Sequence, residues 1–198
     1  FISSHERAFG PIQNSVSIEN IQARVRGNKL MMYSNDNPGV IVLSTGNKSE
    51  VAVGYCTLYG DMVGGFNPLL DVYKTDVYRL AEYMNKRAGQ EIIPRAIIEK
   101  APSAELREDQ KDTDSLLPYS KLDALLRLHI EEYMTSDEII LSGFCKEQGI
   151  SEEEVLRVAQ ALIRGSEFKR QQGVTGSRIS PVAFGIGRRM PIINKFNL

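Results

Sequence analysis

Residues 39–61, GVIVLSTGNKSEVAVGYCTLYGD, decide the fold that we predict for this chain. The stretch opens with an apolar run rich in β-branched residues at Val40–Leu43, and the small and polar residues 44–47 follow. Apolar residues then return at helical spacing, so the order predicts a buried strand, a tight turn and a helix. Asn47 stands at the expected N-cap, and Glu50 lies three residues later, where the carboxylate of a capping box belongs.

This predicted unit places hydroxyl groups and free backbone N–H groups beside the start of a helix, which favours phosphate oxygens. In such a site Glu50, in the first helical turn, would reach a phosphate-bound Mg²⁺. The structural alternative is that Glu50 is only a helix cap, because every α/β protein contains several strand–turn–helix units. The residue types alone favour this second interpretation.

Composition excludes several classes of function. The 198 residues suffice for one domain, with or without an appendage, and the chain begins with Phe1, so we expect a piece of a longer or processed chain. A net charge of −1, from 24 basic and 25 acidic residues, argues against a general nucleic-acid or membrane-surface binder. No apolar run approaches membrane-spanning length. The two cysteines, Cys56 and Cys145, are far apart, which fits packed thiols in a reducing cytoplasm better than a disulfide or zinc site.

Periodicity around the central unit predicts a largely helical remainder. Helices are expected at Ile18–Ser34, Tyr73–Arg87, Ile92–Lys100, Ser120–Tyr133, Ser136–Gln148 and Ser151–Phe168. Residues 1–17 are interpreted as a linker or the end of a missing element, and the Gly pair in residues 62–67 as a loop that allows a close backbone approach. Residues 169–198 form a basic, glycine-containing tail.

Two further features stand out in the rest of the chain. Lys74 stands at the start of a predicted helix, where the helix dipole disfavours a cation unless an anionic ligand lies between them. The alternative is a solvated surface lysine, which the residues alone favour. Residues 101–119, APSAELREDQKDTDSLLPY, form a long charged segment between helices, which is typical of a lid or of disorder. Its carboxylates do not follow the spacing of a calcium loop. A helix-turn-helix over Thr135–Arg164 is disfavoured because its second helix begins with three glutamates.

Several segments together resemble the synthetase domain of bacterial glutamine-dependent NAD⁺ synthetases, in the order of that family and over nearly the whole chain. They are ENIQARVRG (19–27), LSTGNKSEVAVGYCTLYGDMVGGF (43–66), DVYKTDVYRLAEYMN (71–85), APSAELREDQKDTDSLLPY (101–119) and FKRQQG (168–173). The resemblance implies an α/β fold of the adenine nucleotide alpha hydrolase type. That fold is a partial, Rossmann-like, doubly wound parallel sheet with a mainly helical C-terminal region.

The resemblance also implies a reaction. ATP, with Mg²⁺, adenylates the nicotinate carboxylate of deamido-NAD⁺, and ammonia then displaces AMP to give NAD⁺. In the two-domain members of the family a separate domain produces the ammonia from glutamine. The resemblance further implies a cytoplasmic protein that forms a homodimer or a higher homo-oligomer.

Site residues follow from the same matching segments. The resemblance assigns ATP to Thr45, Lys74 and Ser103, and Mg²⁺ to Glu50. Two residues would act in catalysis, because Lys74 offsets charge at phosphorus and Asp61 accepts a proton from ammonia. The residues implied to bind deamido-NAD⁺ are Asn20, Arg24, Glu50, Tyr55, Cys56, Thr57, Leu58 and Lys169.

The sequence also departs from the family pattern. The phosphate-binding motif SGGxDS does not occur in it, and neither cysteine lies in the context of a Glu-Lys-Cys nitrilase triad. The resemblance therefore implies that residues 1–198 are the C-terminal part of one synthetase domain and do not make NAD⁺ alone. Two alternatives stay open: another adenylating, amide-forming synthetase of the same superfamily, such as a GMP synthetase relative, or a non-catalytic association module built on Ile18–Tyr33 and Val51–Tyr59.

Overall fold

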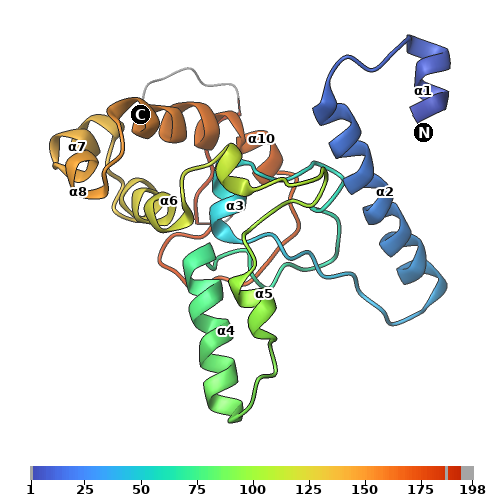
Figure 1. Cartoon of the computed structure of the whole chain (residues 1–198), viewed down its shortest axis with the longest axis horizontal. Coiled ribbons are helices and arrows are strands. Elements are labelled where there is room, and N and C mark those ends of the chain that lie inside the picture. The colour runs from blue at the N-terminus through green and yellow to red at the C-terminus, as the bar shows by residue number, and fades with distance from the viewer. Residues whose placement is uncertain (1, 186, 193–198) are drawn as a thin grey trace.

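The computed structural model of the chain describes residues 2–185 and 187–192. Ten α-helices are found in this part: α1 (Ile2–Phe9), α2 (Ser15–Asp36), α3 (Lys48–Val53), α4 (Lys74–Ala88), α5 (Arg95–Glu99), α6 (Tyr119–Leu126), α7 (Ser136–Leu141), α8 (Phe144–Gln148), α9 (Glu152–Leu156) and α10 (Glu167–Arg170). Three further helical segments of other types join them: η1 (Asp112–Asp114), η2 (Arg127–Glu131) and η3 (Arg157–Ile163). The C-terminal helices gather beside α3, whereas α1 and α2 lie on the other side of it (Figure 1).

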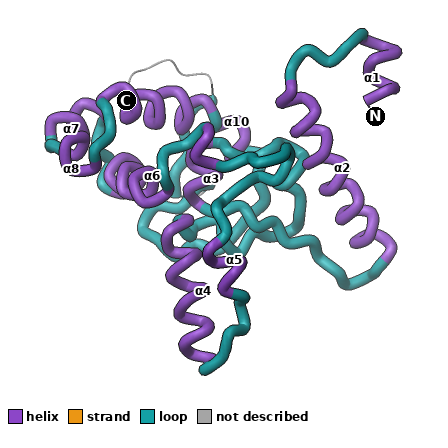
Figure 2. Tube along the Cα trace, in the orientation of Figure 1, coloured by secondary structure: helices purple, strands orange, loops and turns teal. Residues whose placement is uncertain are grey.

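The hydrophobic core lies where α3 packs against α6 and η3. Fully buried side chains come from all three elements and from the helices next to them: Ala52, Leu122, Leu125, Leu126, Ile130, Ile139, Val155 and Val158. The core is thus built by helices of the C-terminal half around one short central helix. The connections that carry most of the predicted site surround that helix (Figure 2).

Helix starts follow the sequence closely. At α3 the Asn47 side chain accepts a hydrogen bond from the Glu50 backbone N–H, and the Glu50 carboxylate accepts one from the Asn47 N–H. The same reciprocal capping begins α7 at Thr135 and α9 at Ser151. The prediction of a capping box at Asn47 and Glu50 is confirmed.

Helix α3 is shorter than the predicted helix because Gly54 ends it. Gly54 adopts a φ of 69°, and its N–H bonds back to the Glu50 and Val51 carbonyls. A Cβ at this position would lie 2.3 Å from Cβ of Ser166, so only glycine fits. The chain therefore leaves the helix at residue 54, and residues 55–59 form a loop instead of a second helical turn.

The predicted doubly wound sheet is not present in the described residues, which form no strand. Parallel pairing is confined to isolated bridges, which join Leu43 to Phe66, Asn67 to Gly176 and Phe184 to Arg188. Around the first of these, Ser44 N donates to Phe66 O at 2.9 Å and Gly65 N donates to Val42 O at 2.9 Å. Three extended segments therefore run in parallel register without forming a continuous sheet.

The prediction that Val40–Leu43 is a buried strand is wrong. Val40, Ile41 and Leu43 are 44%, 59% and 52% exposed. A strand of a parallel sheet is buried only when other elements cover both of its faces. Here the segment pairs with residues 64–67 alone among the described residues. The predicted close approach at the Gly pair is confirmed, since a Cβ on Gly64 would lie 2.8 Å from Val42 O.

The N-terminal helices are longer than predicted and mostly exposed. The helix predicted at Ile18–Ser34 is confirmed as α2, which Asn14 caps. Residues 2–9, which lie in the segment interpreted as a linker or the end of a missing element, form α1. Only Ala23 and Gly27 of α2 are buried. A Cβ on Gly27 would lie 2.7 Å from Gly60 O, so this glycine permits α2 to touch the loop after α3.

The remaining predicted helices are found at the predicted positions, but their lengths differ from the predicted ones. Helices α4 and α5 lie within the predicted ranges, give or take a residue. The predicted Ser136–Gln148 helix is divided into α7 and α8 at Gly143, which has a φ of 84°. The predicted helices at 120–133 and 151–168 each contain a π-helical turn, η2 and η3. Among the described residues no helix is both long and apolar enough to cross a membrane.

Candidate active site

A cavity of about 830 Å³ lies between α2, α3, the loop after α3 and the 101–119 segment. It brings together nine of the residues predicted for the site: Asn20, Thr45, Glu50, Tyr55, Cys56, Thr57, Asp61, Ser103 and Lys169. Three predicted residues, Arg24, Leu58 and Lys74, do not line it. Arg24 donates through Nε to Leu58 O at 3.2 Å, and Lys74 donates through Nζ to the Glu50 carboxylate.

Glu50 has two roles in this wall. One carboxylate oxygen accepts the Asn47 N–H of the capping box at 3.1 Å, and the other accepts a hydrogen bond from Lys74 Nζ at 3.1 Å. Burial opposes the charge of Lys74, but the adjacent Glu50 carboxylate outweighs it and raises the pKa of Lys74. The pair is therefore a fixed ammonium and carboxylate at the edge of the cavity.

Asp61 lies on the wall formed by the loop after α3. Its carboxylate accepts the Thr57 N–H at 2.6 Å, and the Thr57 hydroxyl donates to Asn20 Oδ1 on α2 at 2.7 Å. Burial raises the pKa of Asp61, although the hydrogen bond from Thr57 and the charge of Lys169 oppose that effect. A carboxylate with a raised pKa is a stronger base than an exposed one, so Asp61 is suited to accept a proton.

Lys169 closes the cavity from α10. Its Nζ donates to Gly54 O at 2.8 Å and to Cys56 O at 2.7 Å, so it holds the loop after α3 in place. Burial raises the pKa of the Cys56 thiol to about 12, and burial also raises the pKa of Tyr55 to about 12. Cys56 therefore stays protonated and contributes surface to the wall rather than a nucleophile.

The 101–119 segment forms the fourth wall, and it is tied to its neighbours. Asp112 N donates to Pro102 O at 2.9 Å, which closes the segment on itself, and Gln22 of α2 donates to Leu106 O at 3.0 Å. Sequence reasoning did not single out Asp112, which is buried, lines the cavity and accepts a hydrogen bond from Tyr119 OH at 2.7 Å. The segment contains five carboxylates, and no local pattern distinguishes Asp112 from the other four.

Comparison with known proteins decides the family. The sequence model of the family described as NAD synthase matches residues 1–173. This chain belongs to the NAD synthase family. The residues that line the cavity all fall within the matched range.

Individual relatives agree with the family match. The chain is 53% identical over 186 residues to a glutamine-dependent NAD(+) synthetase of Acinetobacter baylyi, and the alignment covers 94% of this chain and 33% of the relative. It is 48% identical over 196 residues to the corresponding synthetase of Thermotoga maritima, covering 99% and 33%. The NAD synthase chain thus spans about a third of the length of these relatives.

A solved structure supports the fold. The crystal structure of a glutamine-dependent NAD(+) synthetase from Cytophaga hutchinsonii matches 98% of this chain and 32% of its own, with a TM-score of 0.76 at 21% identity. At that identity the likeness concerns the fold alone. It places the chain in the α/β class although the described residues form no strand.

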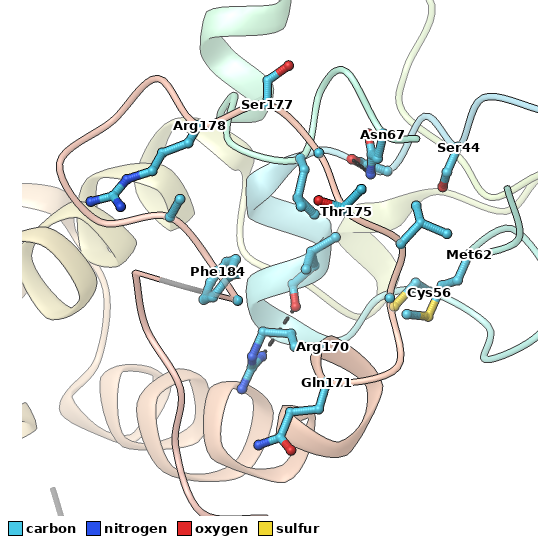
Figure 3. A pocket seen from close by; sticks show the side chains of 18 of the residues that line it. Ser44, Cys56, Met62, Asn67, Arg170, Gln171, Thr175, Ser177, Arg178 and Phe184 are labelled. Atoms are coloured by element: carbon cyan, nitrogen blue, oxygen red, sulfur yellow. Dashed lines mark hydrogen bonds between the residues drawn. The ribbon is translucent and has the colours of Figure 1, made fainter. Parts of the chain in front are cut away.

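A second cavity of about 260 Å³ adjoins the first, and Figure 3 shows the side chains that line it. Ser44, Cys56 and Asp61 line both cavities. Arg170, on the far wall, is ion-paired to Glu167 at 2.9 Å and donates to Ala52 O at 2.6 Å. Asp61 is therefore one of three residues that the two cavities share.

Proposed function

We propose that this chain forms part of the site at which a NAD synthase converts deamido-NAD⁺ to NAD⁺. One observation carries the proposal: nine residues chosen from separate sequence segments surround a single cavity. Glu50 lies on one wall with Lys74 ion-paired to it, and Asp61, a carboxylate with a raised pKa, lies on another. These are the groups that adenylation and amide formation require.

The proposed reaction has two steps. An oxygen of the nicotinate carboxylate attacks the α-phosphorus of ATP, which forms an acyl-adenylate and releases diphosphate. The nitrogen of ammonia then attacks the acyl carbon, the bond to AMP breaks, and the surplus proton passes to Asp61. Because water would hydrolyse an acyl-adenylate, the 101–119 segment acts as a lid in this proposal.

ATP would lie against Thr45, Ser103 and the Glu50–Lys74 pair. Thr45 and Ser103 line the cavity and offer hydroxyl groups, and Lys74, which is bonded to Glu50 of the wall, has protons to donate to phosphate oxygens. Deamido-NAD⁺ is placed between α2 and the loop after α3, against Asn20, Tyr55, Cys56, Thr57 and Lys169, with Arg24 and Leu58 supporting that loop from behind.

Mg²⁺ fits one position in this arrangement. Mg²⁺ in phosphate sites keeps several waters and takes one or two carboxylates from the protein, so Glu50 matches as a single ligand. The described residues offer no cluster of three or more His, Cys, Asp or Glu side chains for a metal ion. When bound, Mg²⁺ would offset charge on the phosphates, while Lys74 exchanges its hydrogen bond to Glu50 for one to the nucleotide.

The remaining parts of the proposal concern the whole protein. We propose that residues 1–198 are the C-terminal part of one synthetase domain, whose other segments carry the SGGxDS loop and complete a doubly wound parallel sheet on the three paired segments. Ammonia would come from glutamine on a separate domain.

Exposed apolar residues on α2, such as Leu30 and Met32, favour a homodimer contact there. Two free cysteines fit a cytoplasmic location.

The test uses the complete product of the gene that encodes this chain, here called the parent protein. It is incubated with deamido-NAD⁺, ATP, Mg²⁺ and either glutamine or ammonium, and NAD⁺, AMP and diphosphate are quantified. We expect equal amounts of the three products. A folded parent protein that forms none of them with either nitrogen source would overturn the proposal.

The isolated chain is the second arm of that test. We expect no NAD⁺ from residues 1–198 alone, because the SGGxDS motif is absent from their sequence. NAD⁺ formation that depends on ATP and ammonia would show that the chain is complete. A dimer in sedimentation without any nucleotide affinity would favour the association module instead.

A further inference from the structure

A single buried carboxylate on α6 joins the starts of two other helices. Asp123 is 2% exposed, and one of its oxygens accepts a hydrogen bond from the hydroxyl of Ser49, the second residue of α3. The other oxygen accepts hydrogen bonds from the backbone N–H of Thr75 at 2.9 Å and from its hydroxyl at 2.8 Å. Thr75 is the second residue of α4. Both oxygens of Asp123 are thus used by residues of other helices.

Ser49 completes the connection. Its hydroxyl oxygen accepts the backbone N–H of Lys74 at 2.9 Å, so α3 binds directly to the first residue of α4. The first N–H groups of a helix have no partner within the helix, and a side chain just before the helix usually accepts them. Tyr73, which precedes α4, makes no such bond. Asp123 and Ser49 take its place from two different helices.

The residues next to this connection are the charged pair of the cavity wall. Glu50 directly follows Ser49, and Lys74 directly precedes Thr75. Their side chains meet at 3.1 Å between Nζ and Oε1. A second contact holds the same helices, because Arg127 of η2 is ion-paired to Asp76 of α4. The backbone positions of Glu50 and Lys74 therefore depend on an aspartate that does not line the cavity.

We propose that Asp123 is a positioning residue that sets the geometry of the Glu50–Lys74 pair for a phosphate-bearing substrate. The proposal rests on the proposed function, because it assigns Asp123 to the same site. The structural alternative is that Asp123 only caps α4, in which case its loss lowers stability and leaves the chemistry of Lys74 unchanged. The two differ in whether the effects of Asp123 and Lys74 are independent.

A double-mutant cycle in the parent protein separates these alternatives. We expect Asp123→Asn to lower kcat by on the order of 100-fold, the loss typical of a misplacement by about 1 Å. Since Asp123 acts through Lys74, the double variant with Lys74→Met should be no slower than Lys74→Met alone. The proposal would be overturned if the two losses in kcat multiplied in the double variant. It would also be overturned by an Asp123→Asn variant with unchanged kcat and a lower Tm.

A matched control comes from His129 on η2. It is also buried, its Nδ1 lies 2.8 Å from Met134 O, and it lines neither cavity. His129→Gln should lower Tm without changing kcat. If Asp123→Asn does not fold, Thr75→Val removes only the hydroxyl bond and keeps the N–H bond, and it should show a smaller loss with the same dependence on Lys74.

A second readout does not require catalysis. The dissociation constant of ATP is measured by calorimetry for the parent protein and its variants. Asp123→Asn should weaken ATP binding, the double variant with Lys74→Met should bind no more weakly than Lys74→Met alone, and His129→Gln should bind as the parent protein does. An unchanged ATP affinity in Asp123→Asn would refute the role of Asp123. A parent protein that makes no NAD⁺ would refute the proposed function, and the ATP affinity would still decide this inference.

Discussion

The starts of α3 and α4 present the same residue in opposite surroundings. Lys48 is the first residue of α3 and Lys74 is the first residue of α4, where the helix dipole disfavours a cation. The Lys48 side chain is 0% exposed and its Nζ contacts Asp71 at 2.9 Å, Glu131 at 2.8 Å and Ser180 Oγ at 2.7 Å. The Lys74 side chain is 19% exposed and meets Glu50.

The difference lies in how many protons each lysine has left to donate. An ammonium group has three, and Lys48 already has four acceptors, since Val182 O lies 2.8 Å away as well. Burial alone would raise the pKa of Asp71. Hydrogen bonds from Ser180 and Lys48 outweigh that effect, so the pKa of Asp71 is lowered. Lys48 therefore ties the tail to the core, whereas Lys74 can still bind a ligand.

The largest effect should come from breaking the Lys48 cluster. Lys48→Met leaves two carboxylates, Asp71 and Glu131, without their shared cation in a buried site. Losing one partner of a buried pair costs about 3–5 kcal/mol, so the free energy of unfolding should fall by that amount in urea titration of the parent protein. The control is Lys74→Met, for which a loss under about 1 kcal/mol is expected. Equal losses would contradict the comparison.

The converse change should affect catalysis instead. In Lys74→Met the phosphate site loses its cation, and kcat for NAD⁺ formation should fall by about 10³-fold, the upper range for one stabilising group at a reacting centre. Lys74→Arg keeps the charge and is expected to recover part of the rate. A Lys74→Met enzyme within threefold of the parent rate would remove Lys74 from the site.

A third change tests the opposite wall of the cavity. Asp61→Asn should lower kcat by about 10²-fold if Asp61 takes the proton from ammonia. Because burial raises the pKa of Asp61, the parent rate should fall as pH drops through a value above the ordinary 3.8, and the variant should lose that acidic limb. An acidic limb that persists in Asp61→Asn would assign it to another group.

The smallest effect concerns the pH dependence of stability. Burial lowers the pKa of His129, so below its ordinary value of 6.5 the unfolded chain binds a proton that the folded chain does not. The contribution of His129 to the free energy of unfolding should therefore be fully present above pH 6.5 and should decrease as pH falls below that value. Urea titrations of His129→Gln should lose this part of the slope between pH 6.5 and 5. An unchanged slope would exclude His129 as its source.

Local rules explain what the sequence could predict. The capping box at Asn47 and Glu50 depends on four consecutive residues, and the structure contains it as predicted. The Glu50 side chain is both the cap and the partner of Lys74, so the structural and functional interpretations of this residue do not exclude each other. Nine of the residues chosen by motif resemblance line one cavity, although the segments that carry them are far apart in the sequence.

Contacts between distant segments explain which features could not be predicted from the sequence. The burial of Val40–Leu43 depends on neighbours that no local pattern specifies, and these side chains are exposed. Asp123 is the one acidic residue in the helix YSKLDALL, and only the folded chain brings Ser49 and Thr75 to it. The sequence does contain one signal for Asp123, since an aspartate between Leu122 and Leu125 on a buried helix needs partners.

The exposed segment at residues 40–43 also has a practical consequence for handling the protein. Residues 40–45, VIVLST, combine high β-propensity with no charge and no proline, which is the composition of segments that stack into fibrils. In concentrated stocks of the isolated chain we expect slow, concentration-dependent fibril formation that thioflavin T detects. Ile41→Lys should suppress it without disturbing the buried core, because the Ile41 side chain is largely in solvent.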